Sequence, residues 1–312
     1  MLHIRRLVQG TDEPVWVDVL NAANRDDEYW RAITLDEFLL EQERPGFDFE
    51  GRFVAELEGR PVGMVHASVD RARTDGQGFI RFGVIPEFRG RRVEQELLET
   101  ALEELKARGM TTAQGGTEST KEDHVRLFEG LGFERVRVFS LMEMDLAGKQ
   151  RDVGENKEVT IRPLRLHVDD DIRLFDRLHN EAFSEHFNFR PRTLAETRHR
   201  LLNNPYAEQR EFFFAALDGE AVGYVGVGID DKYNLERNTR AGWVAVIGVL
   251  KSCRRAGVGT ALTLHAIENL QAKGMSRALL GVDDDNATRA IGVYEKVGFT
   301  VKRKDIVYQR NL

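Results

Sequence analysis

The chain has 312 residues, about twice the length of a common domain, so we expect two domains that each bury a core. Hydrophobic residues make up 41% and charged residues 31%, a composition typical of a soluble globular protein. The formal net charge of -7 argues against nonspecific nucleic-acid binding, which depends on many basic contacts. An anionic ligand therefore has to be held by a local site.

Cysteine usage and hydropathy indicate the compartment. Cys253 is the only cysteine in the sequence, which excludes an internal disulfide and favours a reducing cytoplasm. No apolar run approaches the roughly eighteen residues that a membrane span requires, and no charged-then-apolar leader is visible. We expect a cytoplasmic protein with no membrane partner.

The first half alternates short strands with helices. Thr34 and Glu37 have the spacing of a capping box at the start of the second helix. The polar segment 147–158 is interpreted as a linker. In chain order the predicted elements are a strand over 4–7, helices over 14–23 and 34–42, a hairpin over 53–65, a strand over 78–84, a helix over 93–107, a strand over 110–115, a helix over 121–129 and a strand after Phe133.

The same order begins again after the linker, which indicates an internal repeat. The matching pairs are residues 4–7 with 161–164, the hairpin 53–65 with 213–225, and Gly132-Phe133 with Gly298-Phe299. Each half reads β-α-α-β-β-β-α-β-α-β, which predicts an α/β (α+β) fold with helices packed on a mixed sheet. The predicted domains are residues 1–146 and 159–312.

A glycine-rich loop follows the fourth strand of the second half. Residues 243–250 predict a buried strand, and a helix with one apolar row begins at residue 258. Between them lie two arginines and the glycines Gly257 and Gly259, which let a ligand approach the backbone closely. The N–H groups and dipole of the helix then favour an anion, with phosphate as the prediction. The alternative is an ordinary tight turn with solvated arginines.

The element order, the Arg254-x-x-Gly257-x-Gly259 loop and the later Tyr294-x-x-Val297-Gly298-Phe299 resemble the GNAT superfamily of N-acetyltransferases. The resemblance implies two tandem acyl-CoA acyltransferase domains that use acetyl-CoA as cosubstrate and need no metal. In that family the arginine-glycine loop and its helix hold the cofactor's pyrophosphate. The cofactor-binding residues implied are Ile247, Val249, Arg254, Arg255, Ala256, Gly257, Val258, Gly259, Thr260 and Asn286.

Family resemblance assigns Tyr294 as the acid that protonates the departing thiolate, for which the ordinary tyrosine pKa of about 10 is suitable. The alternative is a core aromatic residue. Asn286 is also explained as a helix N-cap. No Asp or Glu lies between residues 242 and 250, so a base is sought elsewhere. Candidate bases are His186, Glu185, Asp230 and Asp231, and candidate acceptor-site residues are Phe183, His186, Tyr224 and Trp243, all of which equally fit surface or core positions.

The first half departs from the pattern. When Arg89 is aligned with the loop arginine, Arg92 and Glu94 replace the two glycines, and Phe128 replaces Tyr294. A carboxylate at this helix terminus suits the helix dipole but repels a pyrophosphate. We infer that the first half has lost CoA binding, and that the glycines of the second half serve the ligand and not the turn. The alternative is that Arg89, Arg91 and Arg92 hold another anion, although an arginine cluster on an acidic protein is more often a solvated or salt-bridged face.

The predicted function is acetyl transfer to a primary amine of a small molecule by direct attack, with the chemistry in the second half, by a monomer or homodimer. A noncatalytic CoA-binding sensor or scaffold is an alternative. The tandem arrangement and residues 179–186 are also similar to the mycothiol synthase branch of the superfamily. That branch carries a carboxylate early on the fourth strand, where this chain has Trp243.

Overall fold

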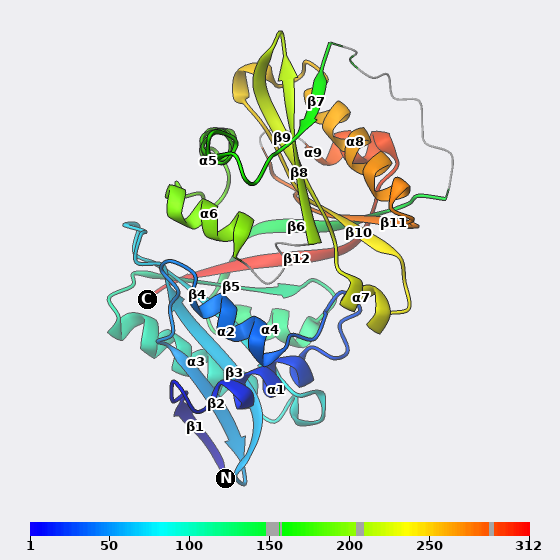
Figure 1. Cartoon of the computed structure of the whole chain (residues 1–312). Helices are drawn as coiled ribbons and strands as arrows, with labels where there is room; N and C mark the ends of the chain where they lie inside the picture. The colour runs from blue at the N-terminus through cyan, green and yellow to red at the C-terminus, as the bar shows by residue number, and fades with distance from the viewer. Residues whose placement is uncertain (148–155, 157, 204–208, 287–289) are drawn as a thin grey trace. The chain divides into compact units, whose positions relative to one another are not determined.

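The computed structural model describes residues 1–147, 156, 158–203, 209–286 and 290–312. The chain forms two compact units (Figure 1): unit 1 comprises Met1–Arg137 with Asp305–Leu312, and unit 2 comprises Val138–Lys304. The two units are not simply the first and second halves of the sequence, because each unit includes a strand segment from the other half. Most of the predicted linker, residues 147–158, lies outside the described residues.

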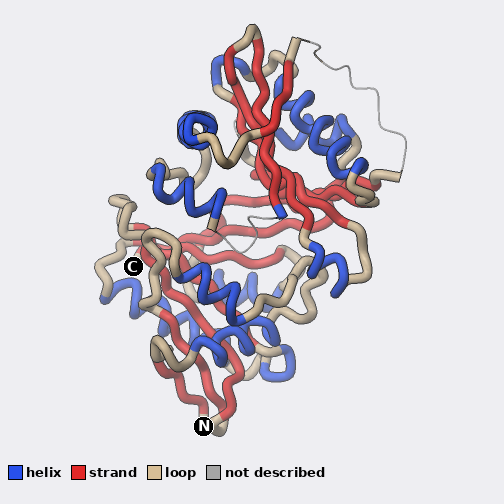
Figure 2. Tube along the Cα trace, in the orientation of Figure 1, coloured by secondary structure: helices blue, strands red, loops and turns tan. Residues whose placement is uncertain are grey.

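Unit 1 is a mixed sheet flanked by helices (Figure 2). Its strands follow the order β1-β2-β3-β4-β5-β12, with β4 and β5 parallel and the other pairs antiparallel. The elements are β1 (Leu2–Arg6), α1 (Glu13–Ala23), α2 (Leu35–Gln42), β2 (Arg52–Leu57), β3 (Arg60–Val69), β4 (Gln77–Val84), α3 (Val93–Ala107), β5 (Thr112–Glu118), α4 (Glu122–Gly130), the first residues of β6 (Glu134–Asp145) and the last residues of β12 (Thr300–Asn311).

The sheet of unit 1 is covered on both faces because its strands alternate two apolar sets of side chains. Val54 and Met64 pack in the cluster formed with α1 and α2. Their neighbours Ala55 and Val65 pack in the cluster formed with α3 and α4. Successive side chains of β2 and β3 therefore point to opposite faces of the sheet, and this one pair of strands contributes to two hydrophobic cores.

Unit 2 repeats this architecture. Its strand order is β6-β11-β10-β9-β8-β7, in which β10 and β11 are parallel. The predicted mixed α/β fold is confirmed in both units, and α7 is an element that the sequence did not indicate. The elements are the end of β6, β7 (Thr160–Pro163), α5 (Asp169–Ala182), α6 (Leu194–Leu202), β8 (Arg210–Leu217), β9 (Glu220–Ile229), α7 (Asp231–Glu236), β10 (Ala241–Val249), α8 (Val258–Ala272), β11 (Arg277–Asp283), α9 (Ala290–Val297) and the start of β12.

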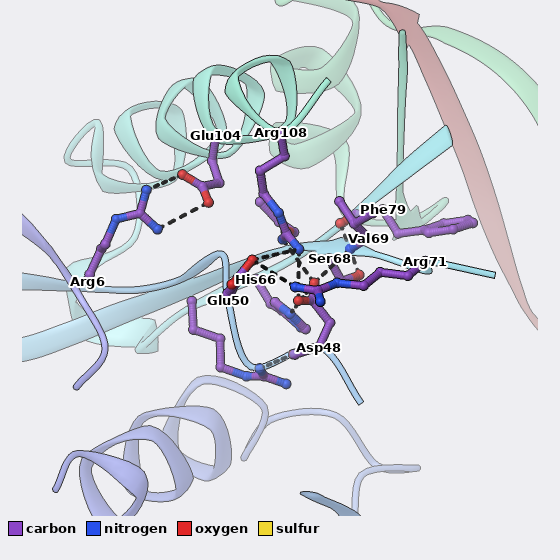
Figure 3. Close-up of polar contacts among 12 residues, drawn as sticks. Arg6, Asp48, Glu50, His66, Ser68, Val69, Arg71, Phe79, Glu104 and Arg108 are labelled. Carbon is purple, nitrogen blue, oxygen red and sulfur yellow. Dashed lines mark hydrogen bonds and ion pairs between the residues drawn. The ribbon is translucent and has the colours of Figure 1, made fainter. Parts of the chain in front are cut away.

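A buried carboxylate joins three segments of unit 1 (Figure 3). Asp48 precedes β2, and its two oxygens accept hydrogen bonds from Arg108, just after α3, at 2.9 and 2.8 Å. The N–H of Val69 in β3 donates to the same carboxylate at 2.8 Å, and Nε2 of His66 lies 3.8 Å from it. Burial acts to raise the pKa of Asp48, but the facing His66 and Arg108 outweigh it and hold that pKa well below its usual value.

We expect Asp48→Asn to lower the free energy of unfolding by about 3 kcal/mol at pH 7, because it removes the buried charge partner of Arg108 and leaves only Glu50, whose side chain is 63% exposed, 3.5 Å from the guanidinium. The folded-state pKa is lowered, so this stabilisation is present above the unfolded-state pKa of about 4 and is lost as pH falls toward the folded-state value. Thermal unfolding at pH 7 and pH 3 should show the difference between variant and wild type narrowing at acid pH.

Asp123→Asn is the matched control, because Asp123 is 93% exposed in its pair with Arg126. Its effect on the unfolding temperature should be much smaller. An equal effect of the two substitutions would contradict a stabilising role for the buried carboxylate.

Candidate functional site

The predicted anion loop lies between β10 and α8. Lys251–Cys253 form one 3-10 turn. Arg255 and Gly257 then adopt left-handed φ angles of 67° and 81°. Gly257 directly precedes α8, so the N–H groups of that helix's first turn, which have no partner within the helix, face the loop. Together with the positive end of the helix dipole, this geometry favours a bound anion.

The parallel strands β10 and β11 pair only at their starts. Residues 241–243 are in register with 277–279, and the ladder ends there. A β-bulge between Val244 and Val246 disturbs β10 just beyond this point. Past the bulge β10 remains paired with β9 on one edge only, so its other edge can bind an extended ligand that contains amides.

A cavity of about 760 Å³ is lined by the diverging ends of β10 and β11, the anion loop, α9 and the end of α5. It brings together residues that are far apart in the sequence and were predicted for three different roles. Those that line it are Ile247, Val249, Arg254, Arg255, Gly257, Gly259, Thr260 and Asn286 for the cofactor, Tyr294 for catalysis, and Phe183 and His186 for the acceptor.

Four of the residues predicted for the cofactor or the acceptor do not line this cavity. The carbonyl of Ala256 accepts a hydrogen bond from the side chain of Asn156 at 2.8 Å. Val258 is buried in the core beneath α8. Trp243 lies in the part of β10 that is paired with β11, where the strands have not yet separated. The fourth, Tyr224, lies behind the cavity wall.

Tyr224 supports this wall from the core. Its hydroxyl is hydrogen-bonded to Nδ1 of His179 at 2.6 Å, and both side chains are buried. Burial, ahead of nearby arginines, lowers the pKa of His179 to about 3, so the imidazole is neutral at physiological pH. A Cβ at Gly248, on the wall, would lie 2.7 Å from the Tyr224 ring. The aromatic ring therefore packs against the strand backbone and not against an acceptor.

Arg254 lines the cavity, but its guanidinium bonds to the protein. Its Nε donates to the carbonyl of Val249 at 3.4 Å, and its Nη2 donates to that of Ala182 at 3.1 Å. Its Nη1 bonds to Glu185 at 2.9 Å, and Lys251 bonds to the other carboxylate oxygen at 2.6 Å. Lys251 and Arg254 hold the pKa of Glu185 below its usual value, which makes this carboxylate a poor base.

The equivalent arginine of unit 1 makes the same kinds of bond. Arg89 donates to the carbonyls of Val84 at 3.0 Å and Ala23 at 2.7 Å. It also bonds to the carboxylate of Asp26 at 3.1 Å. Because unit 1 lacks the loop glycines and keeps this arrangement, the arginine serves the turn. A phosphate contact by Arg254 stays a prediction.

Glu94 of unit 1 places a carboxylate where unit 2 has open space. Glu94 is 7% exposed and accepts a hydrogen bond from the N–H of Gly90 at 3.2 Å. Gly259 is its counterpart, and a Cβ added there would meet no described atom within 4 Å. Unit 1 therefore supplies its own anion at a position that unit 2 leaves open.

The structure corrects the reason given above for Gly257. Its counterpart Arg92 is also left-handed, with a φ of 67°, so the turn requires this conformation in both units. Glycine adopts it without steric cost, and Gly257 therefore serves the turn. Gly259 does not have a positive φ, so its lack of a side chain is explained by the space beside it.

Tyr294 lies on α9, half-buried, at the cavity wall. Burial raises the pKa of its hydroxyl to about 12, so the proton remains bound at physiological pH. Its counterpart Phe128 is fully buried in unit 1, stacked on Tyr308 with ring centroids 5.1 Å apart. Unit 2 thus has a proton-bearing side chain on its cavity wall where unit 1 has a core ring.

Phe139 and Asp283 are among the lining residues that were not predicted from the sequence. Phe139 lies on β6, in the part of the sequence assigned to the first domain. Asp283 ends β11, directly across from Phe139 in the ladder, and is 6% exposed. A carboxylate at the carboxyl end of an apolar strand was the available signal, because ligands of open α/β sheets bind at that edge.

Asp230 and Asp231, considered as bases from the sequence, do not line the cavity. Asp230 caps α7 by accepting a hydrogen bond from the N–H of Tyr233 at 2.9 Å. Within the described ranges, no group of three or more His, Cys, Asp or Glu residues could hold a metal ion. A search of the same residues found no helix with the length and apolarity needed to cross a membrane.

Comparison with known proteins identifies the class of enzyme. A family model described as Acetyltransferase (GNAT) family matches residues 16–133 and 173–299, one match in each repeat. The chain belongs to this family, and it is an acyl-CoA-dependent N-acetyltransferase with tandem domains.

Two curated relatives are mycothiol acetyltransferases. That of Acidothermus cellulolyticus is 29% identical over 235 residues, which cover 73% of this chain and 69% of the relative. That of Frankia casuarinae is 31% identical over 260 residues, or 80% of this chain and 72% of the relative. A solved tandem GNAT protein from the clavulanic acid biosynthesis pathway has a TM-score of 0.74 and 15% sequence identity to this chain. The match covers 100% of this chain and 98% of that protein's chain, and it shows that the two share a fold.

We expect Gly259→Glu to weaken acetyl-CoA binding at least about a hundredfold, because it places a carboxylate, as Glu94 does in unit 1, beside the cofactor's phosphates. Gly259→Ala is the control and should change affinity little, since an added Cβ meets no described atom within 4 Å. Calorimetry with acetyl-CoA measures affinity and stoichiometry. Wild-type protein should bind one molecule per chain, and two sites would contradict the loss of binding in unit 1.

Proposed function

We propose that the chain transfers an acetyl group from acetyl-CoA to a primary amine of a small molecule, with the chemistry in unit 2. The observation that carries this proposal is the single cavity that joins the open anion loop, the unpaired edge of β10 and Tyr294. The loop suits the pyrophosphate of the cofactor, and the strand edge suits its pantetheine amides. The GNAT family uses acetyl-CoA as cosubstrate, which supports the same assignment.

In the proposed reaction the amine nitrogen attacks the thioester carbon directly in a ternary complex. The new C–N bond forms as the C–S bond breaks, and the proton lost by nitrogen balances the charge of the thiolate. Backbone N–H groups of β10 near Ile247 and Val249 hold the pantetheine amides and polarise the thioester carbonyl. Phe183 adds an apolar aromatic side chain to the cavity wall.

Tyr294 donates a hydrogen bond to the departing sulfur. Its pKa of about 12 lies above the value of about 8.5 for an ordinary thiol. Full proton transfer from this hydroxyl to a thiolate is therefore uphill, and the residue acts by stabilising the charge that develops on sulfur. This modifies the role of general acid that was first assigned to it.

A more specific candidate is mycothiol synthesis, in which the acceptor is the cysteinyl amine of a sugar-thiol conjugate. The names of the curated relatives support it, including one at 31% identity. Trp243, in place of a strand carboxylate, is the observation against it. The same missing carboxylate favours the second candidate function, a noncatalytic CoA-binding sensor or scaffold.

We expect Tyr294→Phe to lower kcat at least about tenfold while leaving acetyl-CoA affinity within about twofold, because the hydroxyl acts on the sulfur during the reaction. Acetyl transfer to a panel of primary amines, together with calorimetry, measures both quantities. Tyr308→Phe removes a hydroxyl from unit 1 and should leave kcat unchanged. Acetyl-CoA binding without turnover on any amine would favour the sensor or scaffold.

The pH profile gives a separate test. Since burial raises the pKa of Tyr294 to about 12, its donor form persists throughout the range from pH 6 to 10. We expect kcat to rise as the amine loses its proton and then to remain level up to pH 10. A fall with a midpoint near 10, the ordinary tyrosine value, would show that burial does not raise the pKa of Tyr294.

A further inference from the structure

Basic residues of the anion loop and two carboxylates line the cavity of unit 2, and one of these carboxylates has no role in the reaction proposed above. Of the described residues that line it, the carboxylates are Glu185 and Asp283. Glu185 is exposed and bonded to both Lys251 and Arg254, so its charge is offset at the loop. Asp283 lies at the end of β11, on a different wall, and is 6% exposed.

From this arrangement we propose that Asp283 binds the nitrogen of the acceptor amine, an inference that rests on the proposed function. A primary aliphatic amine enters the site largely as an ammonium ion, which donates short, charge-assisted hydrogen bonds to a carboxylate. The ammonium loses one proton to water before the nitrogen attacks, and the neutral amine keeps an N–H hydrogen bond to Asp283. The anion loop attracts the phosphates of the cofactor, and Asp283 attracts the cation. The two substrates are thereby sorted to different walls of one cavity.

The position of Asp283 is fixed by its strand. β11 pairs with β6 in continuous register from residue 277 to 283, ending at the pair of Asp283 with Phe139. The N–H of Asp284 extends this contact by donating to the carbonyl of Val138 at 3.0 Å. On its other edge β11 has already separated from β10 beyond Leu279. One edge of β11 thus holds the backbone rigidly, while the other faces the cavity.

The surroundings strengthen the proposed attraction. Phe139, which is opposite Asp283 in the ladder, lines the same cavity, so the nitrogen would meet Asp283 beside an apolar aromatic side chain. A charge interaction is stronger beside apolar groups than in bulk water. β10 itself offers no carboxylate between residues 242 and 250, so Asp283 supplies from β11 a charge that β10 lacks.

Asp283 also has a structural task that an experiment has to separate from binding. Its Oδ1 accepts a hydrogen bond from the N–H of Asp285 at 3.1 Å, which shapes the turn after β11. In unit 1 the counterpart Glu118 accepts a bond from the hydroxyl of Thr120 at 2.5 Å, another local role. Asparagine in place of Asp283 keeps an oxygen for the turn and removes only the charge.

The test compares Asp283→Asn with Asp285→Asn, which makes the same charge change at an exposed side chain outside the cavity lining. The probe is the most active of L-cysteine methyl ester, D-glucosamine and spermidine, with acetyl-CoA held at saturation. We expect Asp283→Asn to raise KM for the amine roughly tenfold or more, and to leave acetyl-CoA affinity by calorimetry within about twofold. Asp285→Asn and Asp283→Glu should each retain most of the wild-type kcat/KM.

An unchanged KM for the amine in Asp283→Asn overturns this inference and leaves the proposed function standing. Equal losses in Asp283→Asn and Asp285→Asn overturn it as well, since they indicate a general effect of charge. Wild-type protein that binds acetyl-CoA but acetylates none of the probes overturns the proposed function together with this inference. If Asp283→Asn fails to fold, Asp283→Glu and Asp283→Ser take its place. A KM for the amine near the wild-type value in Asp283→Glu and a raised KM in Asp283→Ser support the inference. Equal KM values in these two variants overturn it.

Discussion

The separation of two parallel strands is the constraint on which the site depends. β10 and β11 share three register pairs and then diverge, and residues of their separated parts line the cavity. An unpaired strand edge is costly when buried, because its N–H and C=O groups lose water without gaining partners. A ligand with amides of its own offsets that cost by completing the ladder. Under the proposed function, the pantetheine amides of acetyl-CoA occupy this gap.

Unit 1 shows that the separation of the two parallel strands is a property of the fold, whereas the open cavity depends on which side chains the sequence places there. β4 and β5 also pair over only three positions, residues 77–79 with 112–114. Beyond them, Phe82 packs on Phe128 with ring centroids 6.0 Å apart and on His124 at 5.1 Å. Burial lowers the pKa of His124 to about 4, so it packs there as a neutral ring. Aromatic side chains in unit 1 therefore occupy a region that unit 2 keeps open.

The hydrophobic periodicity of the sequence, with its capping and turn residues, predicted the helices and strands other than α7. The α3 helix has the predicted bounds, 93–107, and Thr34 forms the expected capping box with Glu37 at 3.1 and 2.7 Å. The residue types of the anion loop also predicted most of the loop residues that line the cavity. The role of Arg254 was not predictable, because a loop motif does not reveal that the carbonyls of Val249 and Ala182 lie within reach of the guanidinium.

Each unit includes a strand segment from the other half of the sequence, which explains why Phe139 and Asp283 were not predicted as site residues. Phe139 lies on a strand that begins in unit 1 and continues into unit 2, and Asp283 is held in place by that same strand. A division of the chain at the polar segment 147–158 separates Phe139 from the loop with which it shares a cavity. Conversely, β5 of unit 1 pairs with residues 305–311 at the other end of the chain. Each unit thus needs sequence from both halves to complete its sheet, so the altered anion loop of unit 1 does not make the first half dispensable.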